Sequence, residues 1–207
     1  MLNDFTFLES LEYRDWSSGI SEAIKVALIK DLDFFEWLEK EGLALARREL
    51  EPMKEHIIRS AKHHMAHIAG ADPFEFGSSR PLDFGHWAAH KLEKLSEFRI
   101  RHGEAVAIGI SLDSAYSFLQ GRIEEADLLR IFNLFRTLGL SLYAPELQED
   151  ALLQGLKEFQ EHLGGRLTIM LLDKLGKGVE VHEMDPELIV KAMHLLQHWE
   201  KQGSIQG

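Results

Sequence analysis

One segment of this 207-residue chain, residues 105–119, restricts its fold more than any other. Its side chains are small and apolar on nearly every side, whereas a helix at a protein surface normally has one polar face. This pattern predicts a central, buried helix. Gly109 lies inside it, and a residue without a side chain lets a neighbouring segment approach closely.

Helical periodicity continues along most of the chain. Residues 1–16 are expected to be a lead-in segment, after which Ser17 and Ser18 offer an N-cap for a helix with an apolar stripe at Ile20, Ile24 and Leu28. Further helices are expected at residues 34–40 (after Asp33 as cap), 43–49, 52–68, 87–98, 124–138, 152–162 and 186–199, with a short one opening at Pro145.

Two segments late in the chain have the composition of strands. Residues 166–172 form the one credible strand, and residues 179–181 could pair with it as a hairpin. The longest irregular stretch, residues 70–80, is either a lid beside a site or a surface loop. The predicted fold is mainly α, with a small two-stranded β element, and forms a single domain over residues 1–207.

Composition argues against several classes of function. The net charge of -11 and the lack of a Lys/Arg cluster argue against a nucleic-acid-binding surface. The chain has no cysteine, so it has neither a disulfide framework nor a thiolate site. No apolar run approaches the length of about 18 residues that a membrane span needs, and no dinucleotide-binding or Walker glycine motif occurs. We expect a cytoplasmic protein without a membrane or nucleic-acid partner.

Three histidines lie near the starts of two successive helices. His86 and His90 are four residues apart and would share one helix face, and His102 comes just before the buried helix. Imidazole is the most common metal ligand, and three protein ligands with an open position are typical of catalytic sites. With 11 histidines in the chain, chance spacing is the alternative. The motif is not the His-Glu-x-x-His of zinc peptidases, because Trp87 stands where the glutamate would be.

Two other groups allow two interpretations each. Glu22 and Lys25 are three residues apart on one helix face, so they form either an exposed ion pair or a carboxylate and an ammonium group that point into a cleft. The histidines His63, His64 and His67 could bind a metal ion, but a solvated helix face or polar contacts are the simpler interpretation.

Four separated pieces of the chain carry a resemblance to a known family. They are GISEAIK at 19–25, DFGHWAAHKLE at 83–93, HGEAVAIG at 102–109 and GRLTIMLL at 165–172. In this order, and across nearly the whole chain, they resemble the C-terminal domain of 3-dehydroquinate synthase and its relatives, the sugar-phosphate cyclases. The second and third pieces are specific together, whereas each alone would be weak.

The resemblance implies a helical domain that binds a zinc or cobalt ion, with the active site in the cleft shared with an N-terminal domain that binds NAD. That N-terminal domain is absent from this chain, so no turnover is expected without it. The family's synthase oxidises a hydroxyl of a seven-carbon sugar acid phosphate with NAD. It then eliminates phosphate, reduces the ketone, opens the ring and closes it by an aldol step. The family commonly forms dimers, so a homodimer is also expected.

The resemblance also implies roles for residues of this chain. The metal ligands would be Glu22, His86 and His102, and one carboxylate with two imidazoles leaves positions open for two substrate oxygens. Lys25 and His90 would be catalytic residues that contact the substrate, with His90 near the phosphate group and the proton relay. The implied substrate-binding set is Lys25, Arg80, Asp83 and His90.

Several positions depart from the family pattern. Asp83 replaces the usual asparagine, Met65 replaces a second substrate-contacting lysine, Arg80 is shifted by one position, and residues 159–161 replace an Asp-Lys-Lys motif. The loss of two cations argues against the standard substrate. The changes at Asp83 and Met65 resemble relatives that make valiolone-type cyclitols from sedoheptulose phosphate, although those relatives lack the histidine retained here as His90. The substrate therefore stays open.

Two other interpretations of the chain compete with this one. A non-catalytic binding or assembly module could keep the same fold, but it would have no need of a matched Glu22, His86 and His102. A domain like that of iron-containing alcohol dehydrogenases has related architecture. The His-Gly-Glu and Glu-Ala-Ile-Lys pieces favour the cyclases.

Overall fold

The structure is a computed structural model that describes residues 4–69 and 83–203. The expected loop at 70–80, and with it Arg80, lies outside the described residues. In chain order the elements are the 3₁₀-helix η1 (Phe5–Ser10), α1 (Tyr13–Lys30), α2 (Leu32–Ala46), α3 (Leu50–Ile68), α4 (His86–Leu95), α5 (His102–Leu119), α6 (Glu125–Thr137), α7 (Glu149–His162), the strands β1 (Ile169–Lys174) and β2 (Lys177–Val181), and α8 (Pro186–Gly203). None of the helices in the described ranges is long and apolar enough to cross a bilayer.

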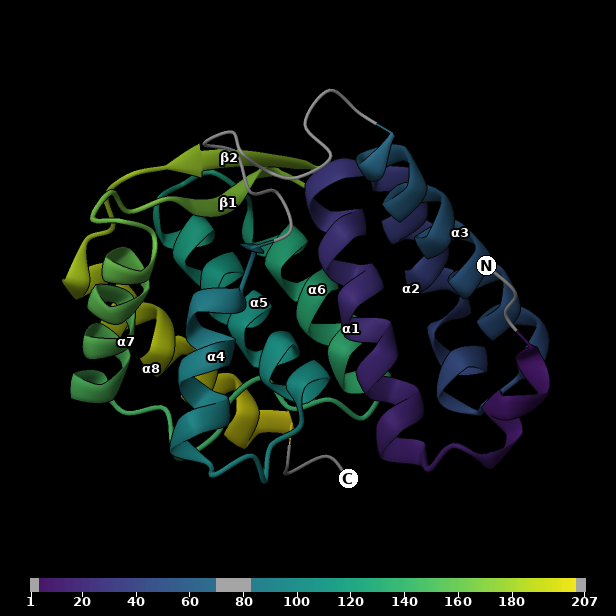
Figure 1. Cartoon of the computed structure of the whole chain (residues 1–207). Coiled ribbons are helices and arrows are strands. Elements are labelled where there is room, and N and C mark those ends of the chain that lie inside the picture. The colour runs from purple at the N-terminus through teal and green to yellow at the C-terminus, as the bar shows by residue number, and fades with distance from the viewer. Residues whose placement is uncertain (1–3, 70–82, 204–207) are drawn as a thin grey trace.

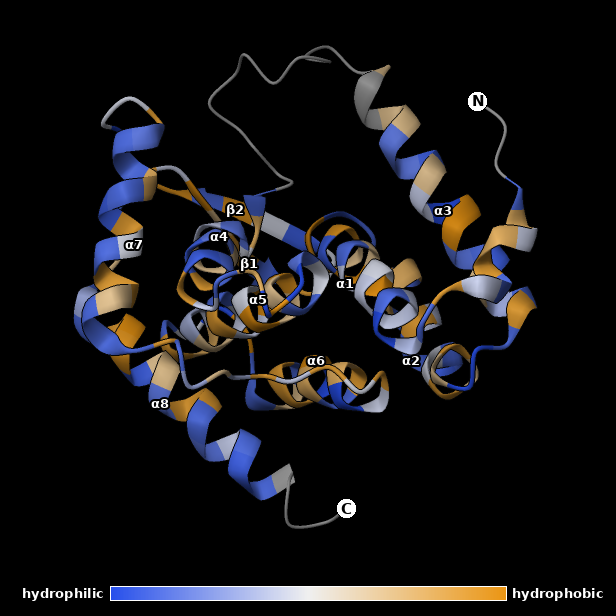
Figure 2. Ribbon diagram, turned by 60° about the horizontal axis from the view of Figure 1, so that its bottom comes forward, coloured by the Kyte–Doolittle hydropathy of each residue, from blue (hydrophilic) through white to orange (hydrophobic). Residues whose placement is uncertain are grey.

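Helix α5 is the centre of the fold. It contacts α1, α4, α6, α8 and β1, and it lies between α4 and α1 with α2 and α3 on one side and α7 and α8 on the other (Figure 1). Every residue from Ala105 to Ser117 is buried. Figure 2 shows hydrophobic residues of α1, α5 and α6 gathered toward the middle of the molecule. The prediction of a mainly α fold around a buried helix is confirmed.

Two glycines of α5 allow its neighbours to approach closely. A Cβ atom on Gly103 would lie 2.2 Å from the carbonyl oxygen of Ser18 in α1. A Cβ atom on Gly109 would lie 2.0 Å from the carbonyl oxygen of Gly85, just before α4. The close approach predicted at Gly109 is therefore confirmed, and together the two glycines seat α1 and α4 against the first half of α5.

Helix α1 begins earlier than predicted. It starts at Tyr13, so Ser17 and Ser18 lie inside it and the N-cap predicted there is wrong. The Ser17 hydroxyl instead donates to the Tyr13 carbonyl. Trp16 is buried, and its indole N–H donates to the carbonyl of Leu45 in α2. The packing of Trp16 against α2 extends α1 by a turn at its N-terminus, which the capping pattern at Ser17 and Ser18 does not indicate.

Two further predictions of helix limits are wrong. The two helices expected within residues 34–49 form the single helix α2, and its N-cap is Asp31 rather than Asp33. The Asp31 carboxylate accepts a hydrogen bond from the backbone N–H of Phe34, which satisfies a free donor of the first turn. The segment at Pro145 is a turn and not a short helix.

The predicted hairpin is confirmed, with slightly different limits. β1 and β2 pair antiparallel, with Ile169 opposite Val181 and an irregularity between Leu172 and Lys174. Gly176 lies in the connecting turn with a φ of +76°, a conformation that favours glycine. The hairpin packs against α1, and β1 also contacts α5.

Candidate metal centre

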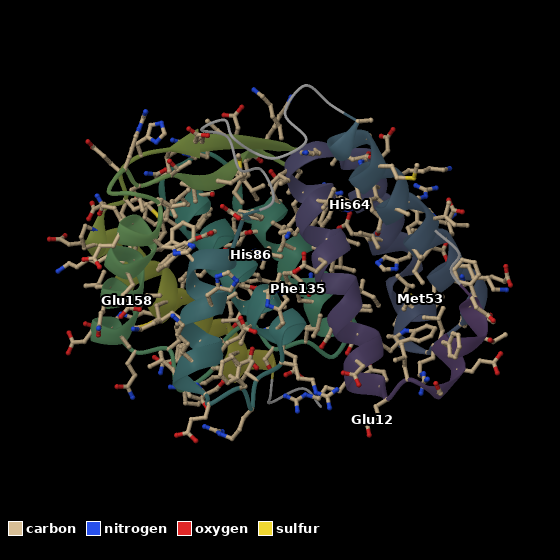
Figure 3. All side chains as sticks on the ribbon, in the orientation of Figure 1. Glu12, Met53, His64, His86, Phe135 and Glu158 are labelled. Carbon is tan, nitrogen blue, oxygen red and sulfur yellow. The ribbon has the colours of Figure 1, made fainter. Side chains whose placement is uncertain are left out.

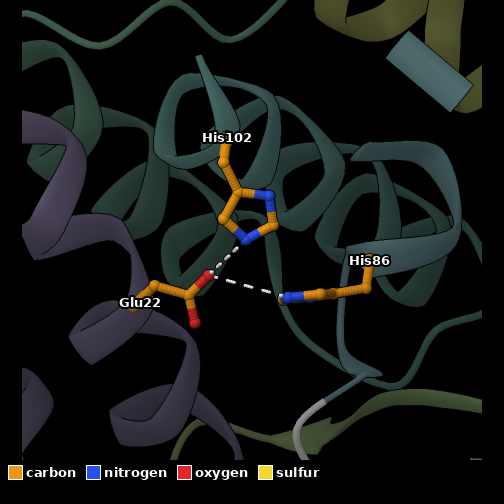
Figure 4. Close-up of side chains that lie close together, drawn as sticks. All are labelled: Glu22, His86 and His102. Carbon is orange, nitrogen blue, oxygen red and sulfur yellow. Dashed lines mark ion pairs between the residues drawn. The ribbon is translucent and has the colours of Figure 1, made fainter. Parts of the chain in front are cut away.

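Three helices each bring one side chain to the same place (Figure 4). Glu22 lies in the middle of α1, His86 is the first residue of α4, and His102 is the first residue of α5. The Oε1 atom of Glu22 lies 3.2 Å from Nε2 of His102 and 3.6 Å from Nε2 of His86. The seating of α1 and α4 on α5 thus brings together three residues that are far apart in the sequence.

The three candidate ligand atoms are close enough together to bind one metal ion. They all lie within 4.8 Å of one another. Two ligands of a tetrahedral ion with bonds of about 2.1 Å lie about 3.4 Å apart, which falls between the two distances measured from Glu22. Its Oε1 atom is buried and accepts no hydrogen bond within the described part of the chain. An unsatisfied buried carboxylate oxygen is unfavourable, and a cation held between it and the two imidazoles would satisfy it.

The other nitrogen of each imidazole has a partner of its own. Nδ1 of His86 lies 3.3 Å from the carbonyl oxygen of Phe84, and Nδ1 of His102 lies 3.3 Å from Oε2 of Glu93. A hydrogen atom on each Nδ1 leaves the lone pair of each Nε2 for a metal ion. Glu93 was not among the predicted site residues. It lies on α4 three residues after His90 and seven after His86, and this helical spacing is the signal that could have identified it.

The position of Lys25 decides between the two interpretations of the Glu22–Lys25 pair. The Lys25 side chain is only 5% exposed, and its Nζ atom lies 2.6 Å from Oε2 of Glu22. The same Nζ atom lies 3.5 Å from Nε2 of His86. The pair therefore points inward, with one oxygen of Glu22 bound to Lys25 and the other facing the histidines.

The charge states of this group suit a cation at neutral pH. Burial raises the pKa of Glu22, but the charges of Lys25, His86 and His102 and the hydrogen bond from Lys25 together lower it by more, so the pKa lies below its ordinary value. Burial, followed by the nearby Lys25 ammonium group, lowers the pKa of His86 to about 4. Near pH 7 the carboxylate is thus charged and the His86 imidazole is neutral, which are the forms that bind metal ions.

Of the other predicted substrate-binding residues, His90 lies at the edge of this group, and Asp83 lies three residues before His86 in the chain. The exposed ring of His90 lies 5.5 Å from the ring of His86 and 6.1 Å from that of His102, between centroids. Asp83 is partly exposed and lies in the short turn before α4. His90 is therefore within reach of a molecule bound at the three ligand atoms, whereas Arg80 lies outside the described residues.

A cavity of about 370 Å³ extends from this group between α1 and α3. Its α1 wall includes Glu22 and Lys25, and its α3 wall includes His56, His63 and His64. In Figure 3, His64 is on α3 toward one side of the molecule, while His86 is nearer its centre. The cavity offers room for a small molecule that also reaches Glu22, one of the three candidate metal ligands.

The histidines of α3 do not form a metal site of their own within the described residues. His63 lies 2.8 Å from a carboxylate oxygen of Asp31 and stacks on Phe34 at 5.6 Å between ring centroids. The side chain of His67 lies outside the described residues. The interpretation of these histidines as a face with polar contacts therefore holds for His63.

A second hollow of about 280 Å³ lies between α4 and α7, beside His90. Its lining includes His90, Lys94, Phe159 and His162. The segment 159–161, which departs from the family pattern, therefore has its first residue in a pocket that His90 shares.

Comparison with known proteins agrees with the resemblance found in the sequence. The sequence model of the family described as 3-dehydroquinate synthase C-terminal matches residues 19–161. The 3-dehydroquinate synthase of Acinetobacter baumannii (strain SDF) is 32% identical over 199 residues, which cover 96% of this chain and 55% of that protein. The 3-dehydroquinate synthase of Nitrosospira multiformis is 34% identical over 188 residues, 90% of this chain and 51% of that protein. This chain thus spans about half the length of the curated relatives it matches.

Solved structures have the same fold. The 2-epi-5-epi-valiolone synthase ValA from Streptomyces hygroscopicus subsp. jinggangensis 5008, solved with NAD⁺ and Zn²⁺ bound, has a TM-score of 0.89 and 28% identity, covering 94% of this chain and 54% of that chain. A 2-deoxy-scyllo-inosose synthase complexed with carbaglucose-6-phosphate, NAD⁺ and Co²⁺ has a TM-score of 0.75 at 20% identity, covering 92% and 55%. The second likeness concerns the fold alone. From the family match over residues 19–161, this chain belongs to the 3-dehydroquinate synthase C-terminal family.

Proposed function

We propose that this chain is the metal- and substrate-binding part of a 3-dehydroquinate synthase-like sugar-phosphate cyclase. Glu22, His86 and His102 would hold a zinc or cobalt ion. The observation that carries the proposal is the convergence of the buried Glu22 Oε1 atom and two imidazole Nε2 atoms on one point. The Zn²⁺ bound to the valiolone synthase of similar fold supports it. A non-catalytic assembly module would have no use for this arrangement.

The surrounding residues would orient and protonate the substrate. When bound, the metal ion supplies Lewis acidity to substrate hydroxyl and carbonyl oxygens. Lys25, whose ammonium group lies beside both Glu22 and His86, would hold an oxygen of the substrate and neutralise negative charge on it. His90, exposed at the edge of the ligand group, would contact the phosphate group and relay a proton.

The proposed reaction also needs NAD, which the N-terminal domain of this family would hold. The steps would be NAD-dependent oxidation, phosphate elimination, reduction of the ketone, ring opening and aldol closure to a carbocycle. Because this chain spans about half the length of its relatives, we propose that it has no turnover without that domain. Location in the cytoplasm and assembly as a homodimer belong to the same proposal.

The substrate would be a sugar phosphate, with two classes in competition. One is a seven-carbon sugar acid phosphate, and the other is a sedoheptulose-type phosphate without the acid group. Met65 is 66% exposed and offers no charge, and Phe159 likewise brings no cation to the hollow beside His90. Lys94 in that hollow could still meet a phosphate group. The loss of cations supports the substrate with fewer negative charges.

The first test is elemental analysis of the purified protein beside a His86→Ala/His102→Ala variant. We expect about one zinc or cobalt ion per chain in the wild type, because the three ligands define one site, and little or none in the variant. A His63→Ala/His64→Ala variant removes two histidines that are outside the ligand group and should keep its ion. Equal metal content in the two variants would contradict the site.

A wild-type protein without metal, even after incubation with zinc or cobalt, would call for the same measurement on a protein that includes the NAD-binding domain. Metal in that longer protein would mean that the second domain completes the site. Its absence there would favour the assembly module. Turnover of the two substrate classes by the longer protein would then decide between them.

A further inference from the structure

Asp113 is a buried acid outside the proposed ligand set, yet it binds the segment that carries His86. It lies in α5 and is fully buried. Its Oδ2 atom accepts a hydrogen bond from the backbone N–H of Gly85 at 2.9 Å, and its Oδ1 atom accepts one from the indole N–H of Trp87 at 2.9 Å. The two donors are the residues immediately before and after His86.

The backbone of the same segment rests directly on α5. Gly85 has a φ of +78°, and a Cβ atom there would lie 2.5 Å from the backbone nitrogen of Ile110. Gly109 lies one helical turn before Asp113. Helix α5 therefore contacts the backbone of this segment around Gly109 and binds it by hydrogen bonds one turn later, at Asp113. Among the described residues no side chain donates or accepts an N-cap hydrogen bond at the start of α4. The hydrogen bonds to Asp113 anchor this end of the helix to α5.

A carboxyl group at this depth must have a compensating role. Burial raises the pKa of Asp113 to about 7, and the hydrogen bonds from Trp87 and Gly85 act to lower it. An apolar side chain would fill the same space without the penalty of burying a polar group. The feature that only an acid provides is a pair of acceptor oxygens on one rigid group. Here those oxygens meet the donors on either side of His86.

We propose that Asp113 is a positioning residue for the metal centre. Through Gly85 and Trp87 it fixes the direction of the His86 imidazole, so that Nδ1 faces the Phe84 carbonyl and Nε2 faces Glu22. The role in metal binding rests on the proposed function. The orientation and tautomer of the imidazole do not, because they can be measured in metal-free protein.

The test uses Asp113→Asn, which keeps the shape of the side chain but has one acceptor oxygen where two donors point. In metal-free protein at pH 8, nitrogen-15 NMR of the histidine side chains reports which ring nitrogen carries the hydrogen atom. The His86 signals, assigned by their absence from His86→Ala, should show hydrogen on Nδ1 in the wild type and a mixture of both tautomers in Asp113→Asn. A mixture in the wild type, or an unchanged tautomer in the folded variant, would overturn the proposal.

Cobalt binding provides the second readout. Asp113→Asn should bind Co²⁺ about 10–100-fold more weakly than the wild type, the loss typical of removing an outer-shell partner. Ser117→Ala is the control, because Ser117 is buried one turn further along α5 and its hydroxyl accepts a hydrogen bond from the N–H of Leu172 in β1. It should leave the tautomer and the Co²⁺ affinity unchanged. If Ser117→Ala loses as much Co²⁺ affinity as Asp113→Asn, the loss is due to general destabilisation of the fold, and the proposal is overturned.

Trp87→Phe is the variant to use if Asp113→Asn does not fold. It removes one of the two donors and leaves Gly85 in place, so we expect a partial change of tautomer and a several-fold loss of Co²⁺ affinity. No change in either would overturn the proposal. The wild type could bind no Co²⁺ and still have a single His86 tautomer that Trp87→Phe loses. That result would contradict the metal centre but not the role of Asp113 in orienting His86.

Discussion

His56 is buried without the partners that a polar side chain normally needs. It is 5% exposed, and neither ring nitrogen has a hydrogen-bond partner within the described residues. Burial lowers its pKa to about 4, whereas an imidazole in an unfolded chain has a pKa of about 6.5. His56 is therefore uncharged in the folded protein near pH 7.

The free energy of unfolding should depend on pH through this residue. Between pH 6.5 and pH 4 the unfolded chain binds a proton that the folded protein does not, so lowering the pH through this window favours unfolding. His56→Leu removes the effect. Its stability relative to the wild type should therefore rise by roughly 1.4 kcal/mol per pH unit as the pH falls from 6.5 toward 4.

Urea denaturation of both proteins at pH 7, 6 and 5 measures this difference. His64→Leu, which removes an exposed imidazole from the same helix, controls for the loss of a histidine. A constant difference between His56→Leu and the wild type across this range would contradict the burial argument.

At the residue scale, sequence patterns predicted side chains that belong to motifs and missed those defined by contacts. Glu22, His86 and His102 were expected together, and the fold brings them together. Glu93 and Asp113 were not predicted. The helical spacing of Glu93 from His86 and His90 could have indicated it. Nothing in the sequence indicates the partners of Asp113, because the packing of α4 on α5 decides which donors it meets.

At the scale of elements, the arrangement of the candidate site depends on backbone contacts made by α5. Gly103 and Gly109 set the distance from α5 to α1 and to the segment before α4. A helix with larger side chains at these points would hold Glu22 and His86 further from His102. The glycines of α5 thus determine whether three ligands can share one ion.

Gly109→Ala should destabilise the fold strongly. The new Cβ atom would lie 2.0 Å from the carbonyl oxygen of Gly85, and backbone atoms cannot move aside without displacing α4. We expect the free energy of unfolding to fall by about 3 kcal/mol, at the upper end for overpacking. Gly19→Ala is the matched control, because a Cβ there meets nothing within 4 Å. It should stabilise α1 by about 0.5–1 kcal/mol through helix propensity.

Both values come from urea denaturation curves under the same conditions. Similar stabilities for the two variants would show that α4 can shift at little cost, against the close packing described above. The pattern of small residues predicted this close approach at Gly109. It could not predict that α1 begins at Tyr13, because the contact of Trp16 with α2 decides that limit.

At the scale of the whole molecule, a bound ion would add a link between helices that already meet through packing and hydrogen bonds. The candidate ligands come from α1, α4 and α5, and unfolding would separate them. A ligand that binds only the folded state raises the free energy of unfolding, by about 2.7 kcal/mol at a concentration one hundred times its dissociation constant. Metal binding and global stability should therefore be linked.

Zinc should raise the thermal unfolding midpoint by roughly 5–10 °C under those conditions, given the size of the chain. The same addition to His86→Ala/His102→Ala should have no effect. Differential scanning calorimetry with and without a chelator measures both. A similar rise in the variant would place the bound zinc elsewhere, and no rise in the wild type would contradict a site made by this chain.

Three charged side chains set the net charge of the candidate metal centre. The ammonium group of Lys25 balances the carboxylate of Glu22, the carboxylate of Glu93 beside His102 adds one negative charge, and imidazoles that serve as ligands carry no charge. A divalent ion would therefore change the net charge from -1 to +1 beside a cavity open to small molecules. The group would attract a dianion such as a phosphate ester only with the ion bound, so the order of binding would be metal first and substrate second.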